Sequence, residues 1–468
     1  MIHSRKSIKN KLQILKEIYI ARLMIENKKR KESPFVYFKD IYGEMGFSDK
    51  ISYSELKDEW KKCLETKQNH RIDLYIHIPL CRSKCKYCQY FSYHLDNNSI
   101  RKKYLDYLEK NFSFYRGVLE KINYGCAYVG GGTPTIFRDD EFRHFLKLFK
   151  ENILFKEGLF ERTFECRLED LNKEKLRCIK DAGFNRISFG IQTFNKETLE
   201  RENRTYVSPE KIKGLVRYCR ENFDFVINAD LIMGLGFDYE KEILENIKQI
   251  LKTEVDTVSL YTIQDKIRGS MMFQNEGSGE KFYERLKLLY EPIEEIAINY
   301  GFKMDSRKEE VQVGWGLLNN SRLLDERIDY KKNLTGEGVS LFAIGWGASG
   351  RIENRLEYQI STKKHYSFDK EKNKCNYISD KKSKIKFLES SLKRGFVDRK
   401  IYLDSFCSDI ESDFQNEIQL LVKKGILKKV DERYYWDTKD VKKKNFYFGI
   451  FYPIEDLIRL YNKNIICF

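Results

Sequence analysis

Short apolar segments alternate with amphipathic stretches through the middle of the chain. Six apolar, β-branched runs predict strands, and the stretches between them carry helical periodicity. The predicted strands are Asp73–Ile78, Cys126–Gly130, Thr163–Cys166, Arg186–Gly190, Phe225–Met233 and Thr257–Ile263. Strands that alternate with helices form right-handed βαβ units and a parallel sheet, and such sheets carry their sites at the carboxyl ends of the strands. The pattern therefore predicts an α/β fold, a partial (β/α)6 barrel of the TIM type.

The two ends of the chain have different patterns. Residues 1–70 are basic and amphipathic and predict a helical N-terminal extension to the barrel at 71–300. Residues 301–383 form a barrel-flanking segment that contains a glycine-rich apolar stretch at 330–352, which predicts packed, tight turns. Residues 384–468 predict three helices and then a β-hairpin, a small winged-helix-like C-terminal domain.

The composition indicates in which cellular compartment the protein works. Of the 468 residues 34% are charged, and no apolar run approaches the roughly 20 residues that cross a bilayer, so we expect no membrane span. The N-terminus contains acidic residues and no small-residue cleavage site, so we expect no signal peptide. Most of the eleven cysteines are scattered, and a chain of this length needs no disulfides. These features favour a reduced, cytoplasmic protein.

The chain is basic and rich in aromatic residues. A solvated, lysine-rich surface explains the net charge of +15, and attraction to anionic substrates or partners is the functional alternative. No basic stripe is interleaved with base-stacking aromatic residues, so we expect no nucleic-acid partner. The aromatic content of 14% suits either an aromatic core or a flat hydrophobic ligand.

Three cysteines follow the first predicted strand at a C-x3-C-x2-C spacing. They are Cys81, Cys85 and Cys88. Thiolates are the preferred ligands of iron–sulfur clusters, and a loop at this point can wrap three of them around one cluster face. Three ligands leave one iron open to chelate a substrate or cofactor. The alternatives are a zinc site with His77 or His94 as fourth ligand, and incidental buried cysteines.

The cysteine spacing, with Tyr87 before the last cysteine, resembles the signature of the radical S-adenosylmethionine superfamily. The preceding YIHIPLC resembles the oxygen-independent coproporphyrinogen III oxidase-like (HemN/HemW-like) family. Five further motifs of that family occur in order: GGGTPT at 130–135, FEC around Glu165, GFNRISFGIQTFN at 183–195, ENRTY at 202–206 and NADLIMGL at 228–235. The resemblance covers about residues 70–350 strongly and the C-terminal region weakly.

The resemblance implies a [4Fe–4S] cluster on the three cysteines and S-adenosylmethionine at its open iron. A glycine-rich loop permits close backbone approach to such a ligand, and a carboxylate can accept hydrogen bonds from ribose hydroxyls or an ammonium group. The residues that the resemblance assigns to this cofactor are Tyr75, Tyr87, Gly131, Gly132, Thr133 and Glu165.

The resemblance also raises the question of a second S-adenosylmethionine. Gln192, Arg204 and Asp230 match positions that hold a second cofactor in the coproporphyrinogen enzyme, and relatives with one cofactor carry them too. Gln264 falls near another family contact, although the family has a small residue there. Ser349, in the glycine-rich segment, is expected to line the cofactor cleft.

The family chemistry implies reductive cleavage of S-adenosylmethionine to a 5′-deoxyadenosyl radical, which takes a hydrogen atom from a small-molecule substrate. Such cleavage needs an electron donor such as flavodoxin or ferredoxin. The residues that carry catalysis itself are not assigned.

Three functions compete within the family. We favour radical methyl or alkyl transfer to a heteroaromatic substrate, because Tyr90 stands where the coproporphyrinogen enzyme has a further cysteine. The first alternative is a tetrapyrrole oxidoreductase, by oxidative decarboxylation of coproporphyrinogen III or by haem-ring opening, which the N-terminal extension and the positive charge support. The second is a haem-binding chaperone without turnover, in which His94 or His365 would ligate haem.

Overall fold

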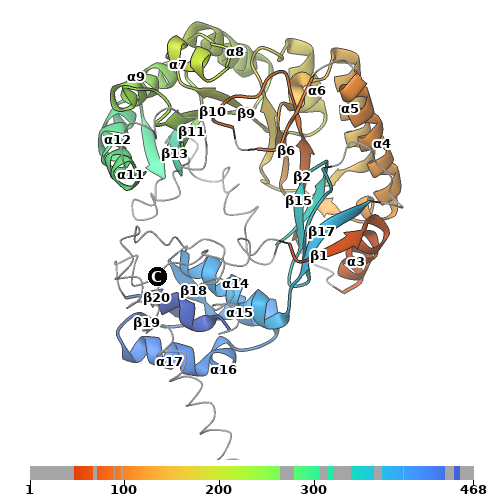
Figure 1. Ribbon diagram of the computed structural model, residues 1–468, viewed down its shortest axis with the longest axis vertical. Helices are drawn as coiled ribbons and strands as arrows, with labels where there is room; N and C mark the ends of the chain where they lie inside the picture. Colours follow the sequence, from red (N-terminus) through yellow and green to blue (C-terminus); the bar gives the residue numbers. More distant parts are fainter. Residues whose placement is uncertain are drawn as a thin grey trace, which may run out of the picture.

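The computed structural model describes ten stretches of the chain (Figure 1). They are residues 47–66, 71–88, 90–95, 99–263, 279–305, 315–320, 339–362, 371–393, 395–437 and 447–453. Within them, none of the helices is both long and apolar enough to cross a membrane.

Parallel strands form the centre of a 13-stranded sheet. They lie side by side in chain order, and every neighbouring pair among them is parallel. They are β2 (Arg71–Ile78), β6 (Ala127–Gly131), β8 (Arg162–Cys166), β9 (Arg186–Gln192), β10 (Val226–Met233) and β11 (Thr257–Thr262). All six predicted strands and the α/β class are therefore confirmed.

Helices connect these strands and lie along the outer side of the arc that the strands make in Figure 1. They are α4 (Ser99–Leu119), α5 (Asp139–Asn152), α6 (Lys173–Asp181), α7 (Lys196–Arg201), α8 (Pro209–Asn222) and α9 (Tyr239–Leu251). Their starts follow from local chemistry: Asn172 accepts from the Lys175 amide at the start of α6, and Ser208 precedes Pro209 at the start of α8.

Aromatic side chains fix the helices to the sheet. Helix α5 buries Phe142, Phe145 and Phe149 at helical spacing. The Phe142 ring lies 5.6 Å from that of Phe164 on β8, and the Phe149 ring lies 5.0 Å from that of Phe184. Much of the aromatic content therefore belongs to the core.

A seventh parallel strand, β14 (Val339–Ile344), pairs with β2. The prediction of tight turns for this region is correct at Gly345 and Gly347, whose φ angles are +117° and +82°, but the prediction missed the strand. A Cβ at Gly345 would stand 2.2 Å from the carbonyl oxygen of His77, so only glycine fits between the two strands. The pairing was not predictable, because the two strands are more than 250 residues apart.

Antiparallel strands extend the sheet at both edges. Beyond β14 they are β15 (Ser349–Ile352), β16 (Leu356–Gln359), β17 (Lys372–Tyr377) and β1 (Asp49–Ser52); beyond β11 they are β13 (Trp315–Asn320) and β12 (Phe302–Asp305). Short strands β3 (Leu80–Cys81) with β4 (Tyr93–His94), and β5 (Asn123–Tyr124) with β7 (Leu154–Phe155), pair separately. The remaining helices of this part are η1 (Pro134–Ile136), α11 (Gly279–Leu288) and α12 (Tyr290–Asn299).

The N-terminal extension is not wholly helical. Its described part contains the helix α3 (Tyr53–Thr66), as predicted, but also the strand β1, which pairs with β17. The four residues of β1 carry little pattern of their own, and a partner more than 300 residues away decides their conformation. The rest of the extension lies outside the described residues.

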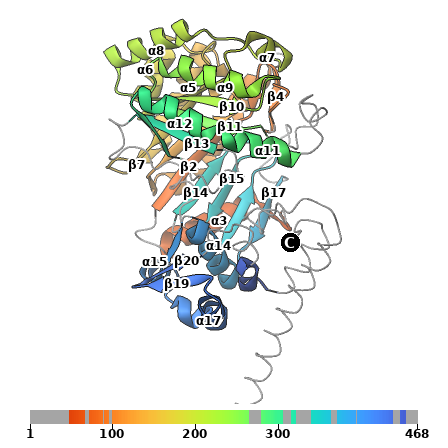
Figure 2. The same cartoon turned by 90° about the vertical axis from the view of Figure 1, so that its left-hand side faces the viewer.

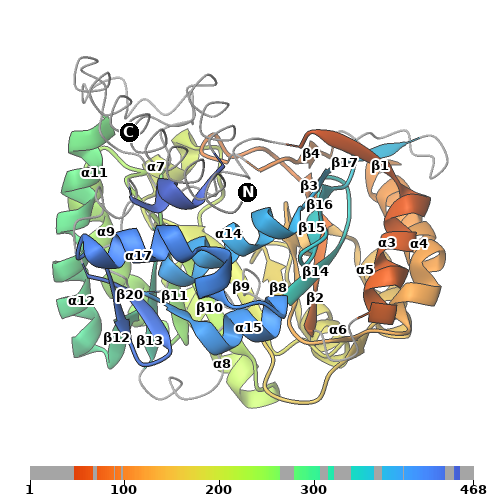
Figure 3. The ribbon, with the colours of Figure 1, turned by 90° about the horizontal axis from the view of Figure 1, so that it is seen from below.

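The C-terminal part has a hydrophobic cluster of its own, from Ile385 to Tyr452. It lies beneath the sheet in the view of Figure 2 and in the foreground of Figure 3, which is seen from below. Its elements are α14 (Asp380–Lys393), β18 (Phe396–Asp398), α15 (Arg399–Phe406), α16 (Ile410–Asp413), α17 (Gln415–Lys423), β19 (Leu427–Val430), β20 (Arg433–Trp436) and η3 (Gly449–Phe451). The predicted helices and the hairpin β19–β20 are present, and β18 joins the hairpin as a third strand.

Helix α3 is predicted to depend on Trp60. The Trp60 ring is fully buried and lies 4.8 Å from Phe342 on β14 and 6.5 Å from Tyr358 on β16. Trp60→Ala would leave a cavity under the helix, and we expect it to lower the free energy of unfolding by about 3–5 kcal/mol in urea titrations followed by circular dichroism. Lys61→Ala, which truncates a surface side chain of the same helix, should change it by less than about 0.5 kcal/mol. Equal effects of the two changes would contradict this packing.

Candidate functional site

The cysteine loop begins directly after β2. Cys81 ends β3, Cys85 is 8% exposed, and the amide of Cys88 donates to the carbonyl of Cys85 at 3.1 Å. Burial raises the pKa of the Cys81 and Cys88 thiols, and the neighbouring cysteines raise both further. The loop thus brings three thiols within electrostatic reach of one another. Their shared negative charge as thiolates is stable only beside a compensating group such as a metal cluster.

The residues present fit an iron–sulfur cluster by the chemistry of their donor atoms. Soft thiolates suit iron–sulfur clusters, and each thiolate of a cluster binds a separate iron atom. Among the described residues, no three side chains of His, Cys, Asp or Glu are grouped closely enough to hold a single metal ion. The Nδ1 of His77 lies 2.6 Å from the Tyr75 hydroxyl. His94 is exposed on β4.

The ENRTY segment after α7 holds the cysteine loop in place. The Lys86 amide donates to the carbonyl of Glu202 at 3.1 Å, and the Asn203 side chain donates to the carbonyl of Lys84 at 3.0 Å. The Arg204 guanidinium lies 4.0 Å from the Cys85 sulfur. Burial alone would lower the pKa of Arg204. The adjacent Tyr87 and Cys85 have a larger effect than burial and raise this pKa. Arg204 therefore keeps a positive charge beside a predicted cluster ligand, a contact that sequence motifs did not suggest.

The glycine-rich loop after β6 packs against the start of the cysteine loop. The Gly132 amide donates to the carbonyl of Ile78 at 2.8 Å, and a Cβ at Gly132 would stand 2.6 Å from the carbonyl oxygen of Leu80. Gly131 has a φ of +114°, which favours glycine. The Thr133 hydroxyl lies 3.9 Å from the Cys81 sulfur. The two loops therefore approach each other through backbone atoms, as the three glycines predict.

Glu165 stands at the end of β8 and joins the glycine-rich loop. The Tyr128 hydroxyl donates to one carboxylate oxygen of Glu165, and the Gly131 amide donates to the other at 2.9 Å. Burial raises the pKa of Glu165 to about 7, and the negative charge of Asp230 adds to the rise, while both hydrogen bonds oppose it. The carboxyl group is thus poised to change its charge near neutral pH, depending on what binds beside it.

Several phenols surround Glu165 and Asp230, and sequence reasoning identified only some of them. Tyr90 is 68% exposed, yet desolvation raises its pKa and the charges of Glu165 and Cys88 raise it further. Burial likewise raises the pKa of Tyr261, together with the charges of Asp230 and Glu165. Tyr128 and Tyr261 were missed, although both face the same side of the sheet as Glu165. Their alternation along β6 and β11 was the available signal.

The buried guanidinium of Arg186 was missed as well. It lies at the start of β9 and forms an ion pair with Glu161 at 3.5 Å. Arg186 lowers the pKa of Glu165 and has Asp230 and Tyr128 among its charged and titratable neighbours. It therefore supplies positive charge under the two carboxylates. A single arginine at the start of a strand carries no sequence signal for that role.

The residues predicted for a second cofactor meet at the ends of β9 and β10. Gln192 has a φ of +71°, unusual for a residue with a side chain, and its buried Oε1 has no hydrogen-bond partner. Arg204 donates to the carbonyl of Gly190 at 2.5 Å, and Asp230 accepts from Asn228 at 2.7 Å. The buried, unpartnered amide oxygen of Gln192 fits a polar ligand.

Two other predicted residues do not reach this group. Ser349 is exposed at the start of β15 and pairs with Gln359 across the strands, at 3.4 Å between side chains. Its contacts in the described stretches do not extend to the cysteines or Glu165, and its place in the cofactor cleft stays a prediction. Gln264 and His365 lie outside the described residues.

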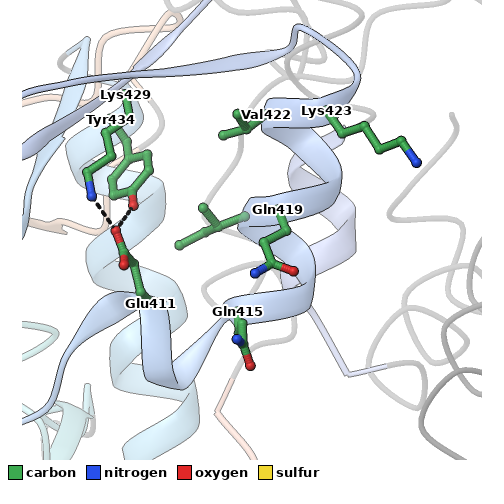
Figure 4. A pocket seen from close by; sticks show the side chains of 8 residues that line it. Glu411, Gln415, Gln419, Val422, Lys423, Lys429 and Tyr434 are labelled. Atoms are coloured by element: carbon green, nitrogen blue, oxygen red, sulfur yellow. Dashed lines mark hydrogen bonds and ion pairs between the residues drawn. The ribbon is translucent and has the colours of Figure 1, made fainter. Parts of the chain in front are cut away.

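A cavity of about 410 Å³ lies elsewhere, in the C-terminal part, and contains none of the predicted site residues. Figure 4 shows Lys429 and Tyr434 directed to Glu411 on one side and α17 on the other. The lining residues are Glu411, Gln415, Ile418, Gln419, Val422, Lys423, Lys429 and Tyr434. Because none of the predicted site residues lines the cavity, we do not assign it to the same chemistry.

Comparison with known proteins agrees with this geometry. The family model described as the radical SAM superfamily matches residues 75–250. The chain is thus similar to that superfamily and, within it, to proteins of the HemN/HemW-like family. A [4Fe–4S] cluster and S-adenosylmethionine are the cofactors that this similarity implies. The assignment of individual residues to them stays a prediction.

The relatives carry two different names. The chain is 26% identical to the heme chaperone HemW of Bacillus subtilis over 62% of this chain and 74% of the relative. It is also 26% identical to the oxygen-independent coproporphyrinogen III oxidase of Helicobacter pylori, over 46% of this chain. The match spans about half (47%) of that oxidase. The structure of the Escherichia coli coproporphyrinogen III oxidase HemN aligns with a TM-score of 0.68 over 87% of this chain and 95% of HemN, at 18% identity, which shows the shared fold.

Glu165→Gln tests the predicted role of the carboxylate. We expect the cluster-loaded variant to bind S-adenosylmethionine about tenfold more weakly at pH 8, because it loses the negative charge that would face the cofactor. As pH falls through about 7, wild-type affinity should also fall, since Glu165 becomes protonated; the variant should lack this step. Anaerobic equilibrium dialysis measures both, with Glu157→Gln, at an exposed position, as the control. Identical pH profiles for wild type and Glu165→Gln would contradict the assignment.

Glu165→Gln should weaken cofactor binding, but we expect it to stabilise the cofactor-free protein at pH 8. A raised pKa means that the fold disfavours the charged carboxylate, so wild-type stability should fall as pH rises from about 4.5 through about 7. Glu165→Gln removes that penalty. We expect it to unfold at higher urea than wild type at pH 8 and to lose this advantage near pH 4.5. A variant that is less stable at pH 8 would show that the carboxylate stabilises the empty fold instead.

Proposed function

We propose that this protein is a radical S-adenosylmethionine enzyme that modifies a tetrapyrrole. One observation carries the proposal: direct contacts join the cysteine loop, the glycine-rich loop and Glu165 at the carboxyl ends of β2, β6 and β8. The cysteine loop supplies thiolates, and the neighbouring strands supply a carboxylate and closely packed glycine backbone. A cofactor that binds both to iron and to protein polar groups needs this combination.

Different residues of the chain would hold the cluster, bind the cofactor and compensate the charge. Cys81, Cys85 and Cys88 would hold the cluster, and Glu165 would accept hydrogen bonds from the cofactor. Arg204 would balance the charge of the thiolates. When bound, the cluster and S-adenosylmethionine supply the 5′-deoxyadenosyl radical of the family chemistry. The protein orients the reacting groups and excludes water from them.

Support for a tetrapyrrole comes from the relatives and from the charge of the chain. The curated relatives described above are named for haem or for coproporphyrinogen. A chain with a net charge of +15 attracts substrates with several carboxylates. The phenols of Tyr75, Tyr90, Tyr128 and Tyr261 offer aromatic faces and polar edges around Glu165 and Asp230, which suit a flat ring with polar substituents.

Two other functions stay open as candidates. Radical methyl or alkyl transfer to a heteroaromatic compound, which Tyr90 favours at the level of sequence, has no support among the relatives described above. Haem binding without turnover is supported by the name of the Bacillus subtilis relative. A second S-adenosylmethionine at Gln192, Arg204 and Asp230 is compatible with the unpartnered oxygen of Gln192.

The finer architecture belongs to the same proposal. The chain order of the six parallel strands supports a partial (β/α)6 barrel. Helices, β18 and the hairpin, with their separate hydrophobic cluster, support a winged-helix-like C-terminal domain from about residue 384. Each cysteine in the described stretches is a free thiol, which supports a reduced, cytoplasmic setting.

Cys85→Ala should abolish both the brown chromophore of the reconstituted protein and 5′-deoxyadenosine formation, because a cluster with two remaining thiolates is not retained. Visible absorption, iron content and chromatography of the products measure these effects. Cys178→Ser, on α6, is the matched control and should retain both. A Cys85→Ala protein with wild-type iron and deoxyadenosine would refute the proposal.

The substrate class is tested by anaerobic turnover with coproporphyrinogen III, haem or no addition. We expect either tetrapyrrole to increase deoxyadenosine formation at least fivefold, with a matching loss of the tetrapyrrole. S-adenosylhomocysteine beside deoxyadenosine would favour methyl transfer instead. Stoichiometric haem binding with no increase in deoxyadenosine would favour the chaperone.

A further inference from the structure

The cysteine loop carries three cationic side chains on its outer face. Arg82, Lys84 and Lys86 are all exposed, and they alternate with residues that turn inward. Lys84 and Lys86 stand immediately before and after Cys85, which is only 8% exposed. Two exposed lysines therefore flank this predicted cluster ligand in the chain.

Of the three cations, Arg82 is the one that pairs with a carboxylate of the described residues. Asp170 is 8% exposed and forms an ion pair with Arg82, whose side chain is still 59% exposed. Glu202 is 3% exposed and pairs with Arg201. For Lys84 and Lys86 no ion pair is found within the described residues. The outer face of the loop is therefore positively charged, while the nearby negative charges are buried.

The backbone that presents these cations is held on both sides. The carbonyl of Lys84 accepts from the Asn203 side chain at 3.0 Å, and the Lys86 amide donates to Glu202 at 3.1 Å. Arg82 donates from Nε to Asp170 at 2.8 Å. Beneath the loop, Arg204 stands 4.0 Å from the sulfur of Cys85. A face fixed in this way is ordered before a partner arrives, which lowers the entropic cost of docking.

We propose that Arg82, Lys84 and Lys86 form the docking surface for a small acidic protein that carries one electron. The inference rests on the proposed function, which needs an electron delivered to the cluster. Electron-transfer partners meet through small, transient interfaces, in which charge complementarity sets the rate of encounter. The transfer moves one electron from the reduced carrier to the oxidised cluster, so the carrier is oxidised by one electron, and no bond is made or broken.

The test uses the cluster-loaded full chain, with reduced flavodoxin as the acidic carrier. Lys84→Glu/Lys86→Glu reverses two charges of the surface, and Lys102→Glu/Lys103→Glu makes the same change at exposed positions of α4. At low salt we expect flavodoxin to reduce the first variant at least tenfold more slowly than wild type. The bleaching of the cluster absorption measures the rate of reduction. The control should stay within twofold of wild type. Reduction by dithionite, a small reductant, should be unchanged in both.

Binding supplies a readout that does not depend on turnover. Calorimetry with oxidised flavodoxin should show a Kd at least tenfold higher for Lys84→Glu/Lys86→Glu than for wild type or the control. Added salt should raise the wild-type Kd and remove the difference, because ions screen the attraction. An acidic ferredoxin in place of flavodoxin should show the same dependence on charge and salt.

Three outcomes would overturn the proposal: equal flavodoxin rates in wild type and Lys84→Glu/Lys86→Glu, equal affinities, or an equal loss in the α4 control. If charge reversal also slows dithionite reduction, the variant Lys84→Gln/Lys86→Gln is used in place of Lys84→Glu/Lys86→Glu. If flavodoxin reduced that variant at the wild-type rate, the proposal would be overturned. A failure of the proposed function can be distinguished from a failure of the docking proposal. In that case dithionite would yield no deoxyadenosine from wild type, while binding and bleaching would still report on docking.

Discussion

The hydrogen bond from the Gly132 amide to the carbonyl of Ile78 joins the two loops on which the site depends. It forms where β2 and β6 end side by side, and it leaves no room for a Cβ at Gly132. A side chain there would separate the glycine-rich loop from the cysteine loop. Because the Gly131 amide next to it also binds Glu165, the same short stretch of backbone positions the carboxylate of the third strand. Parallel strands in register thus convert three distant motifs into one surface.

Burial shapes the chemistry of that surface. Thiols, a carboxyl group and several phenols lie close together in partial exclusion of water, so their neutral forms are favoured in the empty protein. Arg186 and Arg204 supply positive charge among them, one under the carboxylates and one beside Cys85. A bound cofactor with metal and positive charges would restore the ionised forms. The site therefore gains much of its charge complementarity from the ligand, and without that ligand the pKa of Glu165 lies at about 7.

The cysteine loop has two faces with different neighbours. Its inner face meets Arg204 and the glycine-rich loop, and its outer face presents Lys84 and Lys86 to solvent. Contacts from Glu202 and Asn203 hold the loop between these two environments. This arrangement separates the chemistry with small molecules from an encounter with another protein, although fewer than ten residues serve both. A change on the outer face can therefore alter electron delivery and leave the inner contacts intact.

The sequence by itself determined the local features. Apolar runs predicted all six core strands, because these depend on near neighbours along the chain. The cysteine spacing and the glycine motif identified the two loops of the site through the family resemblance. Tertiary structure alone decided the rest. The pairing of β14 with β2 and the strand β1 in the extension depend on partners hundreds of residues away. Likewise, Tyr261 and Arg186 join Glu165 only because adjacent strands align their inward-facing residues, and Arg204 meets Cys85 only because a turn after α7 folds back over the loop. A side chain's own sequence context carries no record of such neighbours, since register and burial are set by the whole sheet.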